Sequence, residues 1–149
     1  MKPSRGIRNN NPGSLRITSD KWDGMSRIQN DGRFVQFIAM PYGLRALLKT
    51  LMTYHKKGFN TVAKIINRWA PNHENPTDDY VRFVAASAGL DPDAVIDPDS
   101  DELVRVAKGI VRFENGPEVA ARYISEDDWS EAVDLLVEDS RSGKPKLDL

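Results

Sequence analysis

The sequence contains no cysteine, which excludes disulfide bonds and thiolate chemistry. Its two histidines, His55 and His73, lie far apart in the chain, so we expect no metal site, and nothing in the sequence suggests another cofactor. No apolar run approaches the roughly 18–20 residues that a membrane-spanning helix needs. The N-terminal segment also has no signal-peptide core. We therefore expect no export signal and no stable membrane insertion.

The residues that are present suffice for one compact domain, since the chain has 149 residues and 40% of them are hydrophobic. We expect a single domain over residues 1–139 and a flexible tail over residues 140–149. The net charge is −1, but residues 1–75 carry 13 basic and 4 acidic side chains, whereas residues 76–149 carry 8 and 18. This asymmetry indicates either a basic surface for an anionic partner or attraction between the two halves inside the fold. The second interpretation is the simpler one.

The hydrophobic pattern changes about one quarter of the way along the chain. Short alternating segments predict β-strands at residues 14–17, 25–29 and 33–38, with Asn30-Asp31-Gly32 as a hairpin turn. Helical periodicity then predicts helices at residues 41–58, 61–69, 77–89, 100–114 and 125–136. The predicted fold class is therefore α+β, with a small N-terminal antiparallel sheet followed by a helical bundle.

Glu114 stands where an apolar helical stripe should continue. Leu103, Val106, Ala107 and Ile110 recur at helical spacing, and Glu114 is the next position on that face. Burial against apolar side chains raises the pKa of a carboxyl group, which keeps a proton donor available near neutral pH. The alternative is that the helix frays early and Glu114 points to water. Periodicity alone leaves both interpretations open.

Three polar clusters, at residues 8–13, 68–75 and 113–116, combine amide side chains with an aromatic ring or proline. Such groups suit sugars, because hydroxyls need directional hydrogen bonds and the C–H faces of a sugar pack on rings. The alternative for each cluster is structural, since asparagines form turns and tryptophans commonly lie in cores. The candidate substrate-binding residues are Asn9, Asn10, Asn11, Arg16, Trp22, Tyr42, Arg68, Trp69, Asn75, Tyr80 and Asn115.

Several motifs together resemble a group of small phage-encoded proteins, the endolysins and virion-associated proteins of the lysozyme-like superfamily. In chain order, the motifs are Arg5-Gly6-Ile7-Arg8-Asn9-Asn10-Asn11-Pro12-Gly13-Ser14-Leu15-Arg16, Trp22-x-Gly24, Phe34-x-x-Phe37, Gly43-Leu44-Arg45-Ala46, Arg68-Trp69-Ala70-Pro71, Glu74-Asn75-x-Thr77 and Glu114-Asn115-Gly116. The resemblance covers about residues 5–116, and its first and third motifs are specific.

The resemblance implies a lysozyme-like fold and cleavage of peptidoglycan between its amino sugars. The enzyme would be a muramidase or a lytic transglycosylase that acts on the MurNAc-GlcNAc bond. It would serve a bacteriophage in cell lysis or in infection, and we expect it to work as a monomer. Without an export signal, it would be made in the host cytoplasm. It would reach the periplasmic wall after holin release or by virion delivery.

The order of the elements departs from the usual lysozyme-like order. There the catalytic Glu ends a helix that precedes the sheet, whereas here the sheet is predicted first and the helix-end Glu comes late. A circular permutation would reconcile the two orders. This hypothesis predicts that Glu114 faces the loop at residues 9–13 and the strands across a cleft.

Two acids are candidates for the proton donor. Glu114 is the first, and Glu74 is the second because it lies in a motif, although nothing in its polar loop would raise its pKa. A carboxylate across the cleft, from Asp20, Asp23 or Asp31, would support hydrolysis. Without one, Glu114 could act as acid and then as base, taking a proton from the sugar's own hydroxyl to close an anhydro ring. The sequence does not decide between hydrolase and transglycosylase.

Two other functions compete with the enzymatic one. The chain could be a non-catalytic glycan-binding or virion structural protein, because fold does not fix function. A nucleic-acid-binding role is disfavoured, since the basic residues are scattered over predicted strands and helices without a recognition helix. We therefore expect peptidoglycan, and no nucleic acid, as the partner.

Overall fold

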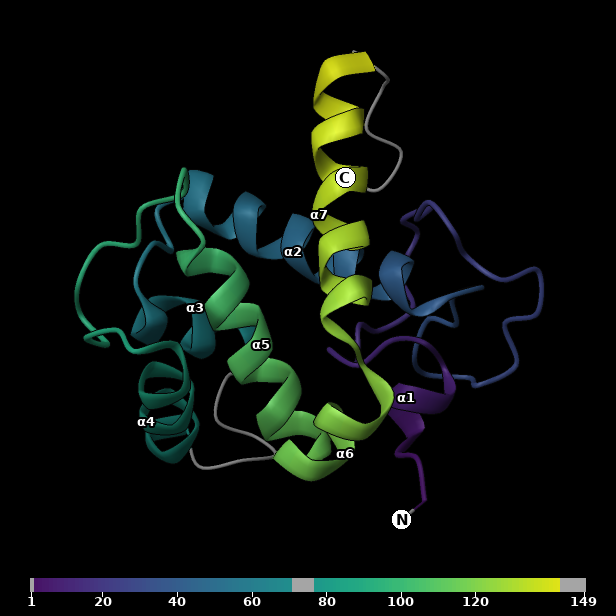
Figure 1. Cartoon of the computed structure of the whole chain (residues 1–149), viewed down its shortest axis with the longest axis horizontal. Coiled ribbons are helices and arrows are strands. Elements are labelled where there is room, and N and C mark those ends of the chain that lie inside the picture. The colour runs from purple at the N-terminus through teal and green to yellow at the C-terminus, as the bar shows by residue number, and fades with distance from the viewer. Residues whose placement is uncertain (1, 71–76, 143–149) are drawn as a thin grey trace.

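The computed structural model describes the backbone of residues 2–70 and 77–142, with side chains for residues 2–70 and 78–139. Within these ranges the chain forms seven helices (Figure 1). They are α1 (Arg5–Arg8), α2 (Met40–Lys56), α3 (Val62–Trp69), α4 (Thr77–Ala88), α5 (Glu102–Asn115), α6 (Pro117–Tyr123) and α7 (Glu126–Ser142). No helix among the described residues is long and apolar enough to cross a membrane.

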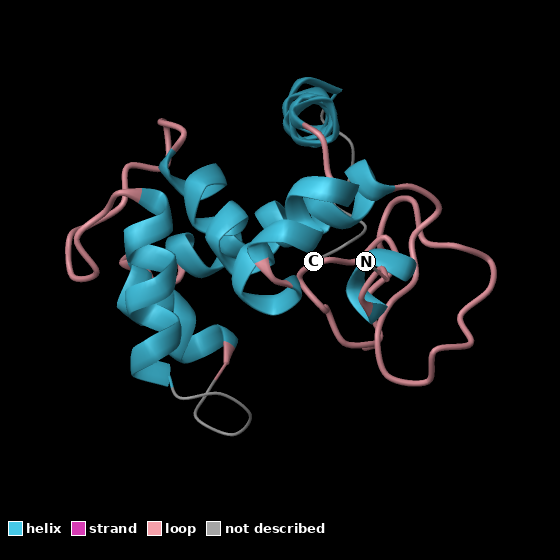
Figure 2. Ribbon diagram, turned by 60° about the horizontal axis from the view of Figure 1, so that its bottom comes forward, coloured by secondary structure: helices cyan, strands magenta, loops and turns pink. Residues whose placement is uncertain are grey.

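The predicted N-terminal sheet is wrong, and with it the α+β fold class. Residues 9–39 run as loops, and the described parts of the chain contain two isolated antiparallel bridges, Arg16–Phe34 and Met25–Phe37, but no strand (Figure 2). The described fold is all-α. The circular permutation required a sheet beside the helices, so that hypothesis is withdrawn as well.

Side-chain amides explain why these extended segments do not form a sheet. The Asn11 Nδ2 group donates to the Leu15 and Val35 carbonyls at 3.0 and 2.9 Å. Gln36 Oε1 accepts from the backbone N–H groups of residues 30 and 31. Backbone groups that a sheet would pair are thus satisfied by side chains, which removes the need for a regular ladder.

The helices at positions predicted from periodicity are confirmed, and α2 is central to the core. Leu44, Leu47, Leu48 and Leu51 of α2 are at most 2% exposed. This helix contacts α3, α5 and α7. Helices α4 and α5 pack closely, since a Cβ atom at Gly109 would come within 3.2 Å of Val84 backbone and side-chain atoms. The core therefore lies among the helices that follow residue 39.

The N-terminal loops form a smaller apolar cluster on one side of α2. Its members are the buried Val35, Phe37 and Ala46, with Leu15, Trp22, Met25 and Tyr42 packed against them. Figure 1 places these loops beside α1, on the opposite side of the molecule from α3 and α4.

Two short helices were not predicted. Helix α1 begins at Arg5 after the N-cap Ser4, whose hydroxyl accepts from the Ile7 N–H. Pro117 starts α6 at its first position instead of only ending α5. Helix α7 continues to Ser142, so it overlaps the predicted tail, and residues 143–149 lie outside the described residues.

Candidate functional site

Glu114 lies in the last turn of α5, which continues through Asn115 and ends at Gly116. The alternative in which the helix frays before Glu114 is therefore wrong. Gly116 has φ +88°, a conformation that glycine adopts without strain and that turns the chain into α6. The apolar face preceding Glu114 is buried, whereas Glu114 itself is partly exposed. The carboxylate thus stands at the edge of the core rather than inside it.

Tyr80 of α4 holds this carboxylate. Its hydroxyl donates a hydrogen bond to Glu114 Oε2 at 2.8 Å. The Tyr80 side chain is fully buried, and its ring stacks on Phe113 with 3.8 Å between the ring centroids. The pKa of Tyr80 is raised, chiefly by burial and then by the charge of Glu114 and the hydrogen bond to Glu114. A hydrogen bond with Trp69 acts in the opposite direction. The raised pKa keeps the hydroxyl protonated at neutral pH, so that it donates to Glu114.

Asn115 joins α5 to the N-terminal motif. Its Nδ2 group donates to the Pro12 carbonyl at 2.7 Å and to the Val111 carbonyl at 2.9 Å, and its Oδ1 accepts from the Ser4 hydroxyl at 2.6 Å. A Cβ atom at Gly6 would lie 2.9 Å from the same Oδ1. The motifs at residues 5–16 and 114–116 are thus in direct contact, with Asn115 making that contact while Glu114 bonds to α4.

The asparagines of the N-terminal motif are bonded within the protein. Asn11 is fully buried, and its amide bonds to backbone groups of Leu15 and Val35. The Asn9 Nδ2 group donates to Asp31 at 3.0 Å, and that of Asn10 donates to the Phe37 carbonyl at 3.0 Å. These three amides hold the loops of residues 9–38 together.

The motif backbone also packs directly on α2. A Cβ atom at Gly43 would lie 1.7 Å from the Asn10 carbonyl oxygen, so only glycine permits this approach. The Gly43-Leu44-Arg45-Ala46 motif therefore has a packing role, and it links the asparagine loop to the central helix.

The candidate aromatic residues occupy two places. Trp22 and Tyr42 are partly buried in the apolar cluster of the N-terminal loops. Trp69 is partly buried at the end of α3, edge-on to Tyr54 with 6.4 Å between the ring centroids. Trp69 thus lies on the same side of the core as Glu114 and Tyr80, whereas Trp22 and Tyr42 belong to the loops. The Tyr80 ring, being fully buried, has no face on which a sugar could stack.

The guanidinium groups of the candidate arginines lie close to aromatic rings. The Arg68 guanidinium lies 5.9 and 5.5 Å from the Tyr54 and Phe59 ring centroids, and that of the exposed Arg16 lies 5.8 Å from the Phe34 centroid. Such stacking orients a guanidinium while its edge remains able to donate.

The candidate second carboxylates differ in their surroundings. Asp31 accepts from Arg5 and Asn9, and these bonds, with the Phe34 N–H, hold the pKa of its carboxyl well below the usual range. Asp23 lies 3.6 Å from Arg45, and the Asp20 N–H donates to Thr18. Among the described residues, no three histidine, aspartate or glutamate side chains gather as a metal site would require.

Glu74 and Asn75 fall in the segment 71–76, outside the described residues.

Sequence reasoning identified Glu114 but not the hydrogen bond that holds it, although Tyr80 begins an apolar stripe that continues at Val84. That spacing indicates a buried ring, and hence a hydroxyl in need of an acceptor.

Comparison with known proteins finds a relative encoded by a bacteriophage. Protein P5 of Pseudoalteromonas phage PM2 is 34% identical to this chain over 117 residues, which are 76% of this chain and 72% of that protein. No family model matches the chain. The name of the relative specifies no activity, ligand or partner.

Proposed function

This chain belongs to the family of Protein P5 of Pseudoalteromonas phage PM2, and we propose that it is a phage muralytic enzyme that uses Glu114 as its general acid. Its substrate is peptidoglycan, cleaved at the MurNAc-GlcNAc bond by hydrolysis or by lytic transglycosylation. It acts on the bacterial wall, which it reaches through holin-made membrane lesions or by virion delivery. The bacteriophage origin of the relative and the helix-end glutamate both support this proposal.

The contact between Glu114 and Tyr80 is the observation that carries the proposal. A general acid must be held within hydrogen-bond reach of the oxygen that it protonates. Tyr80 supplies such positioning, since its buried hydroxyl bonds one carboxylate oxygen at 2.8 Å. The carboxylate itself remains partly exposed, so a polymeric substrate can approach it.

The chemistry requires a proton at the leaving oxygen. Protonated Glu114 donates to the glycosidic oxygen while an oxocarbenium-like centre develops on the muramic acid ring. The resulting carboxylate then accepts a proton, either from attacking water or from a hydroxyl of the same sugar. Attack by water gives a reducing end, and attack by the sugar hydroxyl gives an anhydro ring. Mass spectrometry of the products distinguishes these two outcomes.

The decisive experiment measures release of soluble fragments from purified bacterial sacculi. Glu114→Gln should lower turnover by about 10²- to 10⁴-fold, the usual contribution of a general acid. Glu118→Gln, an exposed acid of α6, is the matched control and should retain activity. Turnover that survives in Glu114→Gln would remove Glu114 from its role, and Glu74→Gln would then test the second candidate.

A non-catalytic role is the second candidate function. The observation that favours it is the internal use of the Asn9, Asn10 and Asn11 amides, since a motif devoted to the framework needs no substrate. In that case the protein would bind glycan or form part of the virion. Wild-type protein that co-sediments with sacculi but releases no fragments would support this alternative over the enzyme.

A further inference from the structure

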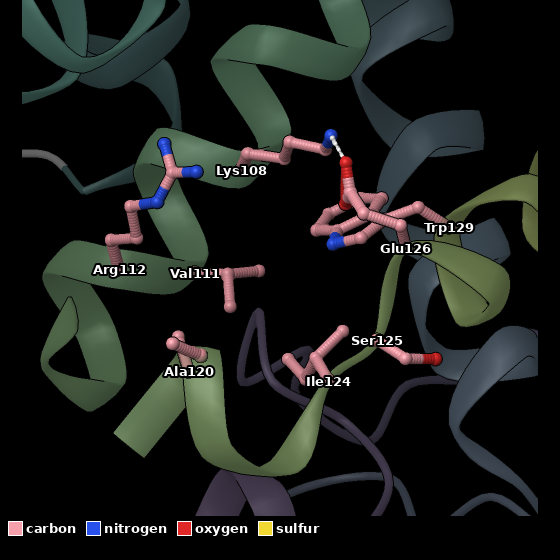
Figure 3. A pocket seen from close by; sticks show the side chains of 9 residues that line it. Lys108, Val111, Arg112, Ala120, Ile124, Ser125, Glu126 and Trp129 are labelled. Atoms are coloured by element: carbon pink, nitrogen blue, oxygen red, sulfur yellow. Dashed lines mark hydrogen bonds and ion pairs between the residues drawn. The ribbon is translucent and has the colours of Figure 1, made fainter. Parts of the chain in front are cut away.

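A pocket of about 370 Å³ lies between α5, α6 and the beginning of α7 (Figure 3). Glu114 does not line it, so the pocket is separate from the proposed catalytic acid. Its apolar wall includes Val111 of α5, Ala120 of α6 and Ile124 between α6 and α7. The volume lies within the range of ordinary small-molecule sites.

The polar groups of this pocket are mainly hydrogen-bond donors. Lys108 and Arg112 of α5 and Trp129 of α7 line it. Trp129 is only 7% exposed, and its indole forms part of the pocket wall (Figure 3). Since an indole nitrogen can only donate, an indole on the pocket wall favours a ligand that brings an acceptor.

The two cations are not fully satisfied within the protein. Arg112 Nη1 donates to the Ser87 hydroxyl at 2.7 Å, which uses one of the five N–H donors of the guanidinium. Lys108 Nζ lies 2.9 Å from Glu126 Oε1 and 5.8 Å from the Trp129 ring centroid.

Glu126 is a replaceable partner for Lys108. The Lys108 side chain is 22% exposed, whereas that of Glu126 is 81% exposed. An ion pair whose acid is so well solvated adds little stability, because water competes for the carboxylate. A ligand anion inside the pocket would meet Lys108 where solvent is scarcer, and Glu126 can turn outward to admit it.

We propose that this pocket binds a small molecule that carries a carboxylate on an apolar or saccharide body. The carboxylate accepts from Lys108, Arg112 and the Trp129 indole, while the body packs on Val111, Ala120 and Ile124. A carboxylate suits the site better than a phosphate, since its single charge costs less to remove from water beside an apolar wall. The site is independent of the chemistry at Glu114.

The test follows the indole N–H signals of ¹⁵N-labelled full-length protein during titration. The chain has three tryptophans, and the signal lost in Trp129→Phe identifies the one in the pocket. The probes are N-acetylmuramic acid and N-acetylglucosamine, which differ by the 3-O-lactyl group that carries the carboxylate. N-acetylmuramic acid should move the Trp129 signal saturably, and N-acetylglucosamine should leave it in place at the same concentrations.

Two variants test the charge requirement. Lys108→Gln should raise the Kd of N-acetylmuramic acid about tenfold. Ala121→Glu places a negative charge at an exposed position on the pocket wall, where folding tolerates it, and should weaken binding similarly. Lys64→Gln, an exposed lysine of α3, is the control and should bind as the wild type does.

Three results would overturn the proposal. They are an unmoved Trp129 signal, an equal response to both sugars, and a wild-type Kd in both Lys108→Gln and Ala121→Glu. The readout does not depend on turnover, so its failure is distinct from failure of the proposed muralytic activity.

Discussion

Single side chains fix the two arrangements on which the candidate site depends. The Tyr80 hydroxyl sets the orientation of Glu114, and Asp31 gathers Arg5, Asn9 and the backbone of residues 33 and 34 into one loop framework. In both cases a carboxylate is the acceptor, and its side-chain donors come from distant parts of the chain. Each contact therefore has its own measurable consequence.

Replacing Tyr80 by phenylalanine should change the pH dependence of the proposed activity. The hydroxyl hydrogen bond favours the charged form of Glu114, so its removal makes the carboxylate hold its proton more strongly. A general acid is active while protonated. The high-pH limb of the activity profile should therefore move to higher pH in Tyr80→Phe.

Tyr54→Phe serves as the control for this substitution, because Tyr54 is partly buried and, among the described hydrogen bonds, the tyrosine that bonds to Glu114 is Tyr80. It should keep the wild-type profile. A Tyr80→Phe profile identical to that of the wild type would show that the hydroxyl has only a packing role.

Asp31 should make stability depend on pH. Its folded-state pKa is lowered, chiefly by Arg5 and then by Asn9, so its stabilising effect is complete above the unfolded value of about 3.9 and is lost as pH falls further. Asp31→Asn should unfold at a lower urea concentration than the wild type at pH 7. The difference should shrink steadily below about pH 4, and a difference that stays constant down to pH 2 would contradict this account.

At the scale of elements, the sequence was informative wherever burial imposes a helical period. The stripes of α2 and α5 follow directly from side chains that must face the core, whereas Glu114, expected as a buried acid on the same face, is partly exposed. The predicted sheet was wrong because the alternation of apolar and polar residues indicates which side chains are buried. It does not indicate which groups form hydrogen bonds with the backbone. Here Asn11, Gln29 and Gln36 take that role. Contacts between elements, such as that of Tyr80 with Glu114, required the packing of α4 on α5 and could not be read from local pattern.

The attachment of α7 to α2 gives a prediction at the same scale. Arg45 of α2 is 3% exposed, and its Nε donates to Asp139 of α7 at 3.0 Å, with a second, shorter bond from Nη2. Asp139→Asn removes the nearer of the two carboxylate charges beside this buried guanidinium, the other being that of Asp23, and should lower the free energy of unfolding by about 1–3 kcal/mol. Hydrogen exchange should quicken selectively in the last turns of α7.

Asp134→Asn alters an exposed acid of the same helix and provides the comparison. It should leave both stability and exchange unchanged within about 0.5 kcal/mol. Equal effects of the two substitutions would mean that general charge, not the Arg45 contact, governs docking of α7.

In the whole molecule, as far as the structure describes it, only some of the opposite charges of residues 1–75 and 76–149 form ion pairs between the two halves. Arg45 and Asp139 join the basic half to the acidic half, but Lys108 pairs with Glu126 within the acidic half. Meanwhile Lys21 and Arg27 are exposed on the N-terminal loops, which stand to one side of the helical core (Figure 1). We therefore predict that the loops present a basic surface to an anionic partner, which is one of the two interpretations of the charge asymmetry in the sequence.

This surface predicts that the protein, despite its net charge of −1, is retained on a cation exchanger at pH 7 in low salt. Retention should disappear near 0.5 M NaCl, because screening shortens the range of exposed charges to a few ångströms. The double variant Lys21→Gln/Arg27→Gln should elute earlier than the wild type. A second double variant, Lys57→Gln/Lys64→Gln, removes the same charge elsewhere and should elute later than the first. Since sacculi are also anionic polymers, the same order should hold for co-sedimentation with them. Equal elution of the two double variants would mean that net charge, and not the loop surface, governs the association.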